Sequence, residues 1–352
     1  MQKILIIGCG RVANHYRYLA KKIFNRNNKV VAVADLDRIK SESFGNFFNC
    51  NSYLDYETAI KNESPNLIII LTPSGSHYEI GMKCLKKKIN TVVEKPMAMT
   101  PNECNKLINY AKKNKLLFST VFQNRFNPSI VFVNDLIKKG LFGKIVTANI
   151  RLRWARYQDY YEDGWHGTWR NDGGVINQQC IHHIDILNMI NGPIKEVCAY
   201  SLNVINNLEA EDTMTAIFNF KNNSTGTLEA TTAARPHDIE ASLSIIAEKG
   251  YFEIGGIALN KIKYIHLNNN KINQKKIIKQ LSEKVPGGYG LSHFRFYKKL
   301  FNSLNNNLII PPVDNESASQ TTRIIHALYK SSETKSWIKV DNNSISNKLG
   351  IK

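Results

Sequence analysis

The chain has 352 residues, 43% of them apolar, and a formal net charge of +18 because 47 basic residues outnumber 29 acidic ones. This length exceeds what one hydrophobic core usually serves and predicts two domains. The basic excess favours anionic partners such as nucleotides or phosphorylated sugars, although a genome-wide bias toward Lys, Asn and Ile would also produce it. The basic residues are scattered, with no Arg-rich run or aromatic-interleaved stripe, which argues against nucleic-acid binding.

Cysteine usage and hydropathy bear on the compartment. The six cysteines are spread along the chain without a C-x-x-C pair, a pattern typical of reduced thiols in a cytosolic protein. The apolar run at the N-terminus is too short for a signal-peptide core. No run approaches the ~20 apolar residues of a membrane helix. We therefore expect a soluble, cytoplasmic protein without a membrane partner.

The first part of the chain alternates strand-like and helix-like patterns. Apolar runs typical of buried strands occupy residues 3–8, 29–35, 66–72, 90–96 and 116–122. Helical spacing or a helix-start signal marks residues 11–24, 76–88 and 101–114. Apolar strands that alternate with helices predict an α/β fold, a doubly wound parallel sheet covered on both faces. We expect this domain to span residues 1–122.

The pattern changes in residues 123–352, which we expect to form the second domain. A helix over 127–143 is followed by an alternating, half-buried strand over 144–154. Strand-like runs then come in succession: VCAYSLNVI, DTMTAIFNF, STGTLEATTAA, IEASLSIIA and GYFEI. They predict an α/β domain with a large, mostly antiparallel sheet. Further helices are expected at 291–304 and 317–331. Residues 267–280 are expected to form a surface loop, and residues 338–352 a tail.

A glycine-rich turn joins the first strand to the first helix. Gly8, Gly10 and Ala13 fit G-x-G-x-x-G/A, in which the glycines allow a tight turn and close approach of a pyrophosphate. The helix that starts at Arg11 and Val12 would face the phosphates with its N-terminus. Asp35 ends the second strand, where it could accept hydrogen bonds from ribose hydroxyls and repel a 2′-phosphate. The turn thus predicts NAD in preference to NADP, although Arg38 could pair with such a phosphate.

Four segments behind this turn carry a resemblance: TPSGSHYE (72–79), VVEKPMAMT (92–100), FQNRFNP (122–128) and GGVINQQCIHHID (173–185). In this order they resemble the glucose–fructose oxidoreductase, inositol dehydrogenase and rhizopine-catabolism (Gfo/Idh/MocA) family over nearly the whole chain. Residues 154–187 look most like the dehydrogenases that oxidise the 3-hydroxyl of UDP-N-acetylglucosamine or of its uronic acid. The resemblance implies a Rossmann domain with bound NAD(P), and an open sheet that forms an oligomer interface in a dimer or tetramer.

Lys95 and His182 are the candidate catalytic residues. Lys95 follows a buried parallel strand, in the crevice where ligands bind in open α/β sheets, and the resemblance implies that it is the family's catalytic lysine. The Lys95–Pro96 bond is a candidate cis peptide. On a helix His182 would share a face with Gln178 and Asp185, and the resemblance aligns it with the catalytic imidazole. Gln178 departs from the family's Asp or Asn and cannot act as a base.

The polar segment 173–187 also allows other interpretations. It could bind a metal, but no second His/Cys cluster completes a ligand set. It could also be a polar helix end with structural histidines, since histidine is often partly buried without a function. We interpret Cys180 as a packing residue and His183 as a structural group.

The remaining candidates come mainly from the resemblance. Those expected to contact the cofactor are Thr72, Pro73, Ser74, His77, Glu94, Lys95 and Gln123. Those expected to contact the substrate are Lys95, Arg125, Arg153, Tyr157, Tyr161, Trp169, Gln178 and His182. Aromatic side chains can stack on a uracil or sugar ring and arginine can bind a diphosphate, but ordinary packing explains any single aromatic equally well.

Together these residues predict NAD-dependent oxidation of a nucleotide-sugar ring hydroxyl, at C3, for amino-sugar synthesis toward surface polysaccharide or lipid A. His182 would accept the hydroxyl proton and Lys95 would stabilise the alkoxide, or the two would exchange roles. Three alternatives stay open: a free-sugar or inositol dehydrogenase, a cofactor-retaining glycosidase, and a non-catalytic NAD-binding regulator.

Overall fold

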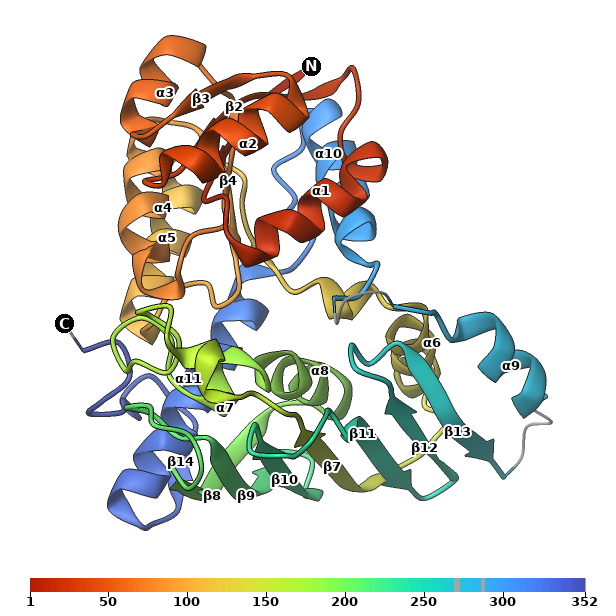
Figure 1. Cartoon of the computed structure of the whole chain (residues 1–352). Coiled ribbons are helices and arrows are strands. Elements are labelled where there is room, and N and C mark those ends of the chain that lie inside the picture. Colours follow the sequence, from red (N-terminus) through yellow and green to blue (C-terminus); the bar gives the residue numbers. More distant parts are fainter. Residues whose placement is uncertain (269–272, 286–288, 352) are drawn as a thin grey trace. The chain divides into compact units, whose positions relative to one another are not determined.

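The computed structural model describes residues 1–268, 273–285 and 289–351. The chain divides into two compact units, each built around its own sheet (Figure 1). The first unit comprises Met1–Phe122 and Leu291–Ser319, and the second comprises Gln123–Gly290 and Gln320–Lys352. The segment Leu291–Ser319, expected in the second domain, therefore clusters with the first.

The sheet of the first unit has six parallel strands in the order β3-β2-β1-β4-β5-β6. The strands are β1 (Gln2–Ile7), β2 (Asn28–Ala34), β3 (Asn51–Tyr53), β4 (Leu67–Ile70), β5 (Asn90–Glu94) and β6 (Phe118–Val121). Every side chain of β4 is fully buried, because helices cover both faces of a parallel sheet. The predicted doubly wound α/β fold is confirmed.

Local sequence explains the helices of this unit. In α1 (Arg11–Ile23) the buried residues Ala13, Tyr16, Leu19 and Ile23 recur at helical spacing. A capping box starts α5 (Pro101–Lys113), since Thr100 and Glu103 exchange side-chain and backbone hydrogen bonds. The expected helix at residues 76–88 forms as α4 (His77–Lys86), after one 3₁₀ turn, η1 (Ser74–Ser76).

Three elements between β2 and β4 were not predicted: α2 (Arg38–Phe48), β3 and α3 (Tyr56–Glu63). Asp37 and Asp55 cap the two helices, their carboxylates accepting backbone N–H groups of the first turn. These acidic caps were the available signal, but the segment lacks the long apolar runs that mark the other elements.

Aromatic packing explains why Leu291–Ser319 joins the first unit. Helix α10 (His293–Asn305) contacts α1. The Tyr297 hydroxyl lies 3.1 Å from that of Tyr16, and their rings pack edge to face. Both tyrosines are fully buried, so α10 completes the core on one side of α1.

The second unit contains eight strands in the order β13-β12-β11-β7-β10-β9-β8-β14. They are β7 (Ile145–Arg153), β8 (Ile194–Leu202), β9 (Thr213–Phe220), β10 (Thr225–Thr231), β11 (Glu240–Ala247), β12 (Gly250–Gly255), β13 (Lys261–Leu267) and β14 (Ile338–Lys339). Only the β7–β10 pair among them is parallel. The predicted mostly antiparallel sheet is confirmed.

Helices cover one face of this sheet. They include α6 (Pro128–Lys138), α7 (Val175–Gln178), α8 (Ile181–Asn191) and α11 (Asn315–Thr334), which starts in the first unit. Figure 1 shows α7 and α8 lying over the strands. In β7 the side chains of Ala148, Ile150 and Leu152 are buried. Arg151 and Arg153 alternate with them and point to the opposite, open face.

The two segments that were expected to form a loop and a tail contain a helix and a strand. Within 267–280 lies most of α9 (Gln274–Leu281), while residues 269–272 fall outside the described part of the chain. In 338–352, β14 pairs with β8, and the Gly350 N–H donates to the Trp169 carbonyl. Lys352 also falls outside the described part. Among the described residues, no helix combines the length and apolar character needed to cross a bilayer.

Candidate active site

The glycine turn between β1 and α1 is required by the backbone. Gly8 has φ +97°, and a Cβ there would lie 2.7 Å from the Leu71 carbonyl carbon. A side chain at Gly8 would therefore need both a strained conformation and a backbone shift. Gly10 precedes α1, and a Cβ there would meet no protein atom within 4 Å. The turn combines one position where only glycine fits with one that opens onto free space.

The start of α1 suits an anionic ligand. No side chain caps this helix and its first turn holds no acidic residue, so its N–H groups and positive dipole end remain available to a phosphate. Arg11 is exposed and Val12 half-buried there. Asp35 Oδ2 accepts the Cys9 N–H at 2.7 Å and Oδ1 accepts the Asp37 N–H at 2.9 Å. These two bonds fix the Asp35 carboxylate beside the turn, the position from which it is predicted to contact a ribose. Arg38 is exposed.

The loop after β4 holds four predicted cofactor residues. Pro73 is exposed, Ser74 is buried, and the hydroxyls of Thr72 and Ser76 lie 2.7 Å apart. His77 is only 1% exposed. Its Nδ1 lies 2.7 Å from the Pro96 carbonyl oxygen and its Nε2 2.9 Å from that of Thr72. His77 is thus engaged with the backbone of two loops and does not face solvent.

Glu94, Lys95 and Pro96 form the turn after β5. The Lys95–Pro96 peptide bond is cis. Lys95 is half-exposed, whereas Glu94 and residues 96–99 are buried. Glu94 accepts hydrogen bonds from the Tyr16 hydroxyl at 2.8 Å and from the Lys95 N–H at 3.2 Å. The Lys95 side chain is therefore the polar group of this turn that solvent, or a ligand, can reach.

The Glu94 carboxylate is held as an anion. His293 Nε2 of α10 lies 3.5 Å from Glu94 Oε1. Burial by itself would raise the pKa of Glu94, but His293, Tyr16 and Lys95 outweigh that effect and lower the pKa below its usual value. The sequence did not reveal that Tyr16 and His293 contact Glu94. Both residues lie far from Glu94 along the chain, and no local pattern indicates such a contact.

The second group of candidates lies on α7 and α8. We expected one helix through Gln178, His182 and Asp185, but α7 ends at Gln178 and α8 begins at Ile181. The Cys180 N–H donates to the Val175 carbonyl, five residues back, so the chain loosens at that point. In residues 172–187 every side chain is buried except Gln178 and His182, which are half-exposed. Gln178 and His182 are thus accessible, whereas Asp185, predicted to share their face, is buried.

A short 3₁₀ turn, η2 (Gln123–Phe126), is tied to α8 at two points. The Gln123 amide nitrogen lies 3.4 Å from His182 Nε2. Because an amide nitrogen only donates, His182 Nε2 is the acceptor in this contact and carries no proton in it. Arg125 forms a bidentate ion pair with Asp185, with nitrogen–oxygen distances of 2.6 and 2.8 Å. Gln123 and Arg125 therefore support α8, and Arg125 has its guanidinium committed to Asp185.

Asp185, which the sequence predicted to share a face with His182, is instead buried. Its side chain is 1% exposed, and it also accepts the Thr321 hydroxyl at 2.8 Å. His183, expected as structural, is fully buried, which lowers its pKa to about 3. Cys180 is fully buried as well, in agreement with a packing role. No signal in the sequence pairs Arg125 with Asp185, which lie sixty residues apart.

The predicted substrate residues of the aromatic segment differ in exposure. Tyr157 is exposed, with the Arg235 guanidinium 4.3 Å from its ring centroid. The Tyr161 hydroxyl lies 2.8 Å from that of Thr232, and burial raises its pKa to about 12. Trp169 packs edge to face on Tyr329. The structure thus leaves Tyr157 the most accessible of the three.

Arg153 lies away from the other candidates of the second unit. It forms a bidentate ion pair with Glu229 at 2.6 and 2.7 Å. Since it lies on the open face of the sheet and α8 packs on the buried face, Arg153 and His182 belong to opposite faces. Buried and exposed side chains alternate along β7, which places Arg153 on the open face. The alternating sequence pattern of residues 144–154 already indicated this.

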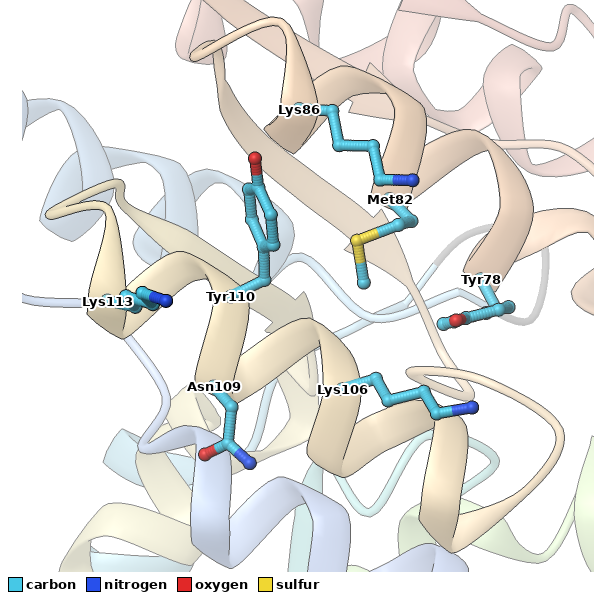
Figure 2. Close-up of a pocket in the computed structure, with 7 residues that line it drawn as sticks. All are labelled: Tyr78, Met82, Lys86, Lys106, Asn109, Tyr110 and Lys113. Carbon is cyan, nitrogen blue, oxygen red and sulfur yellow. The ribbon is translucent and has the colours of Figure 1, made fainter.

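The structure also contains a groove that none of the predicted residues line. It lies between α4 and α5, has a volume of about 420 Å³, and Figure 2 shows its seven side chains. They are Tyr78, Met82, Lys86, Lys106, Asn109, Tyr110 and Lys113. Among the described residues no three His, Cys, Asp or Glu side chains gather closely enough to hold a metal ion.

Comparison with known proteins matches both units. The model of an oxidoreductase family with an NAD-binding Rossmann fold matches residues 2–122, and that of the GFO/IDH/MocA C-terminal domain matches residues 130–253. The crystal structure of the WlbA dehydrogenase from Chromobacterium violaceum, in complex with NADH and UDP-GlcNAcA, is 26% identical with a TM-score of 0.89. That likeness covers 97% of this chain and 96% of the other.

Two further relatives are more distant in sequence. The WlbA dehydrogenase from Bordetella pertussis shares the fold at a TM-score of 0.91 and 24% identity, over 97% of this chain and 98% of that one. Inositol 2-dehydrogenase from Rubrobacter xylanophilus is 25% identical over 64% of this chain and 63% of its own length. The first curated relatives are matched over less than two thirds of their length. The match of both domain models over most of the sequence shows that the chain belongs to the Gfo/Idh/MocA family of oxidoreductases with an NAD-binding Rossmann fold.

Proposed function

We propose that this protein is an NAD-dependent dehydrogenase that oxidises the 3-hydroxyl of UDP-N-acetylglucosamine or of its uronic acid. Its 3-keto product would feed amino-sugar synthesis for surface polysaccharide or lipid A. The observation that carries this proposal is the likeness, over 97% of the chain, to a dehydrogenase solved with NADH and UDP-GlcNAcA. The accessible Lys95 and His182 support it, because they supply the proton chemistry that such an oxidation requires.

The residues of the first unit fit NAD. The α1 N-terminus and the open space at Gly10 suit its pyrophosphate, and the fixed Asp35 carboxylate suits ribose hydroxyls. The negative charge of Asp35 would repel a 2′-phosphate, which favours NAD over NADP. When bound, NAD would supply the acceptor for the hydride that leaves the sugar carbon. The contribution of the protein is therefore to orient the reactants and to handle the proton.

His182 and Lys95 divide the proton chemistry in this proposal. His182 Nε2 is the acceptor nitrogen of the Gln123 contact. It accepts the proton of the sugar hydroxyl once that hydroxyl takes the place of the amide, as the carbon–hydrogen bond breaks. The Lys95 ammonium stabilises the negative charge that develops on the same oxygen. Gln178, half-exposed beside His182, orients a hydroxyl through its amide. Arg125 and Arg153, which are also expected to contact the substrate, form ion pairs with Asp185 and Glu229.

An enzymatic assay tests this function. The unmodified protein is incubated with NAD or NADP and with UDP-N-acetylglucosamine, its uronic acid, or myo-inositol, and nicotinamide reduction is followed. We expect reduction of NAD with a UDP-sugar. Lys95→Ala and His182→Ala should each lower kcat by about 10²–10⁴-fold while NAD still binds. Turnover of inositol alone, or no turnover with any sugar, would contradict the proposal.

A second candidate, oxidation of a free sugar or inositol, is favoured by the likeness to inositol 2-dehydrogenase. The same panel separates the two, since a nucleotide-sugar enzyme should not reduce NAD with inositol. We also propose that the protein is a homo-oligomer that pairs through its open sheet face, where Tyr200, Ile217 and Ile246 are exposed. Light scattering in solution should then give a mass of at least two chains, and a monomer would contradict this.

A further inference from the structure

The turn that carries Lys95 depends on side chains for its position. Strands β4 and β5 are neighbours, but their ladder ends at Ile70 and Val93. Beyond those residues the two loops are no longer joined by strand hydrogen bonds. On one side, Glu94 holds the turn through the Lys95 N–H and Tyr16. On the other side, His77 is the side chain between Thr72 and Pro96.

His77 has the geometry of a link between these two loops. Its ring nitrogens lie 2.7 Å from the Pro96 carbonyl and 2.9 Å from the Thr72 carbonyl. It is 1% exposed, so water cannot replace its hydrogen bonds without rearrangement. Burial lowers the pKa of His77, and the N-terminal end of α4 also disfavours a positive charge. Both facing atoms are carbonyl oxygens, which only accept, and a neutral imidazole has a single N–H, so the neutral ring donates to one of them only.

We infer that His77 is a positioning residue that fixes Lys95 by donating a hydrogen bond from Nδ1 to the Pro96 carbonyl. This inference rests on the proposed function, which gives Lys95 its catalytic role. The shorter of the two contacts joins Nδ1 to the residue directly after Lys95. Loss of that bond frees the Lys95 turn, whereas the glycine turn and Asp35, which suit NAD, have their own backbone bonds.

Two conservative substitutions separate the two ring nitrogens. In His77→Asn the amide can take the place of Nδ1 and still donate to Pro96. In His77→Gln the longer side chain brings its amide to the place of Nε2, toward Thr72. We expect kcat to stay within about threefold of the unmodified protein in His77→Asn and to fall about 100-fold in His77→Gln, the scale of a 1 Å misplacement. The dissociation constant for NAD should change in neither variant.

A second readout does not require turnover. The rate at which acetic anhydride acetylates the Lys95 amine, measured by peptide mass spectrometry over a pH series, reports the environment of that amine. We expect this rate to change in His77→Gln and to be preserved in His77→Asn. If the unmodified protein oxidises no sugar, the proposed function fails, while the acetylation rates still decide whether His77 positions Lys95. The control is His326→Gln, another buried histidine, whose Nδ1 accepts the Ser346 N–H.

The control variant should lose stability without altering Lys95 acetylation or kcat. Equal loss of kcat in His77→Asn and His77→Gln, or unchanged acetylation of Lys95 in both, would overturn the inference. If His77→Gln does not fold, ¹⁵N-histidine NMR of the unmodified protein supplies the test. The His77 signals are identified by their loss in His77→Asn. A proton on Nδ1 supports the inference, and an Nδ1 without a proton overturns it.

Discussion

The glycine turn of the first unit and helix α8 of the second unit hold their candidate residues in different ways. In the glycine turn of the first unit, backbone geometry sets the positions, because Gly8 has a positive φ and α1 starts directly after Gly10. In the second unit, pairs of side chains from distant segments do so, as Arg125 with Asp185 shows. A substitution in the glycine turn therefore acts through the conformation of the chain, whereas a substitution of Arg125 acts by leaving the Asp185 carboxylate without its cation.

Loss of the buried ion pair in the second unit should reduce stability the most. Arg125→Ala leaves the Asp185 carboxylate, 1% exposed, without its cation. We expect the free energy of unfolding to fall by about 3–5 kcal/mol, because an uncompensated buried charge is costly. Urea denaturation of the variant measures the loss. A change under ~1 kcal/mol would mean that Asp185 does not depend on Arg125, and side-chain pairing would no longer distinguish the second unit.

The glycine turn offers a matched pair of substitutions in the first unit. Gly8→Ala should lower the free energy of unfolding by about 2–3 kcal/mol, since both the positive φ and the Leu71 backbone oppose a Cβ. Gly10→Ala should fold normally, because its Cβ meets no protein atom, and should weaken NAD binding alone. Thermal melts with and without NAD separate the two results. Equal destabilisation by both would contradict a backbone requirement specific to Gly8.

A buried carboxylate in the second unit predicts a pH dependence. Glu211 accepts the Ile176 N–H at 3.0 Å and the Tyr329 hydroxyl at 2.9 Å, and burial raises its pKa from 4.5 to about 7. A raised folded-state pKa stabilises the protein below about pH 4.5, and that stabilisation is lost as the pH rises toward about 7. Glu211→Gln should remove roughly 2 kcal/mol of this dependence between about pH 5 and 8. Denaturation curves that remain parallel to those of the unmodified protein would show that Glu211 is ionised throughout.

The smallest effect is expected for the ion pair on the open face. The Arg153 and Glu229 side chains are 37% and 40% exposed, so Arg153→Ala should cost less than about 1 kcal/mol in the monomer. Its bidentate geometry matches that of Arg125, which makes burial the variable between the two substitutions. A loss as large as that of Arg125→Ala would show that burial does not set the strength of these pairs.

The contrast between the units also explains what could be predicted from the sequence. Order and spacing identified the glycine turn, Asp35 and the loops after β4 and β5, because strand ends of a parallel sheet meet at one edge. The same reasoning placed Gln178 and His182 on one accessible face. It could not assign Asp185 to a buried ion pair or His293 to Glu94, since no local pattern encodes a partner sixty or more residues away. For α2 and α3, the only signals in the sequence were the acidic N-cap residues Asp37 and Asp55.

Because Leu291–Ser319 belongs to the first unit, the position of the junctions matters when related genes are recombined. The chain passes between units after Phe122, after Gly290 and after Ser319. A hybrid gene made with one junction at residue 122 would combine α1 from one parent with α10 from another, so Tyr16 and Tyr297 would come from sequences not selected together. Recombinants that keep both parental cores intact need three junctions, and chimaeras built that way should retain the most protein in soluble form.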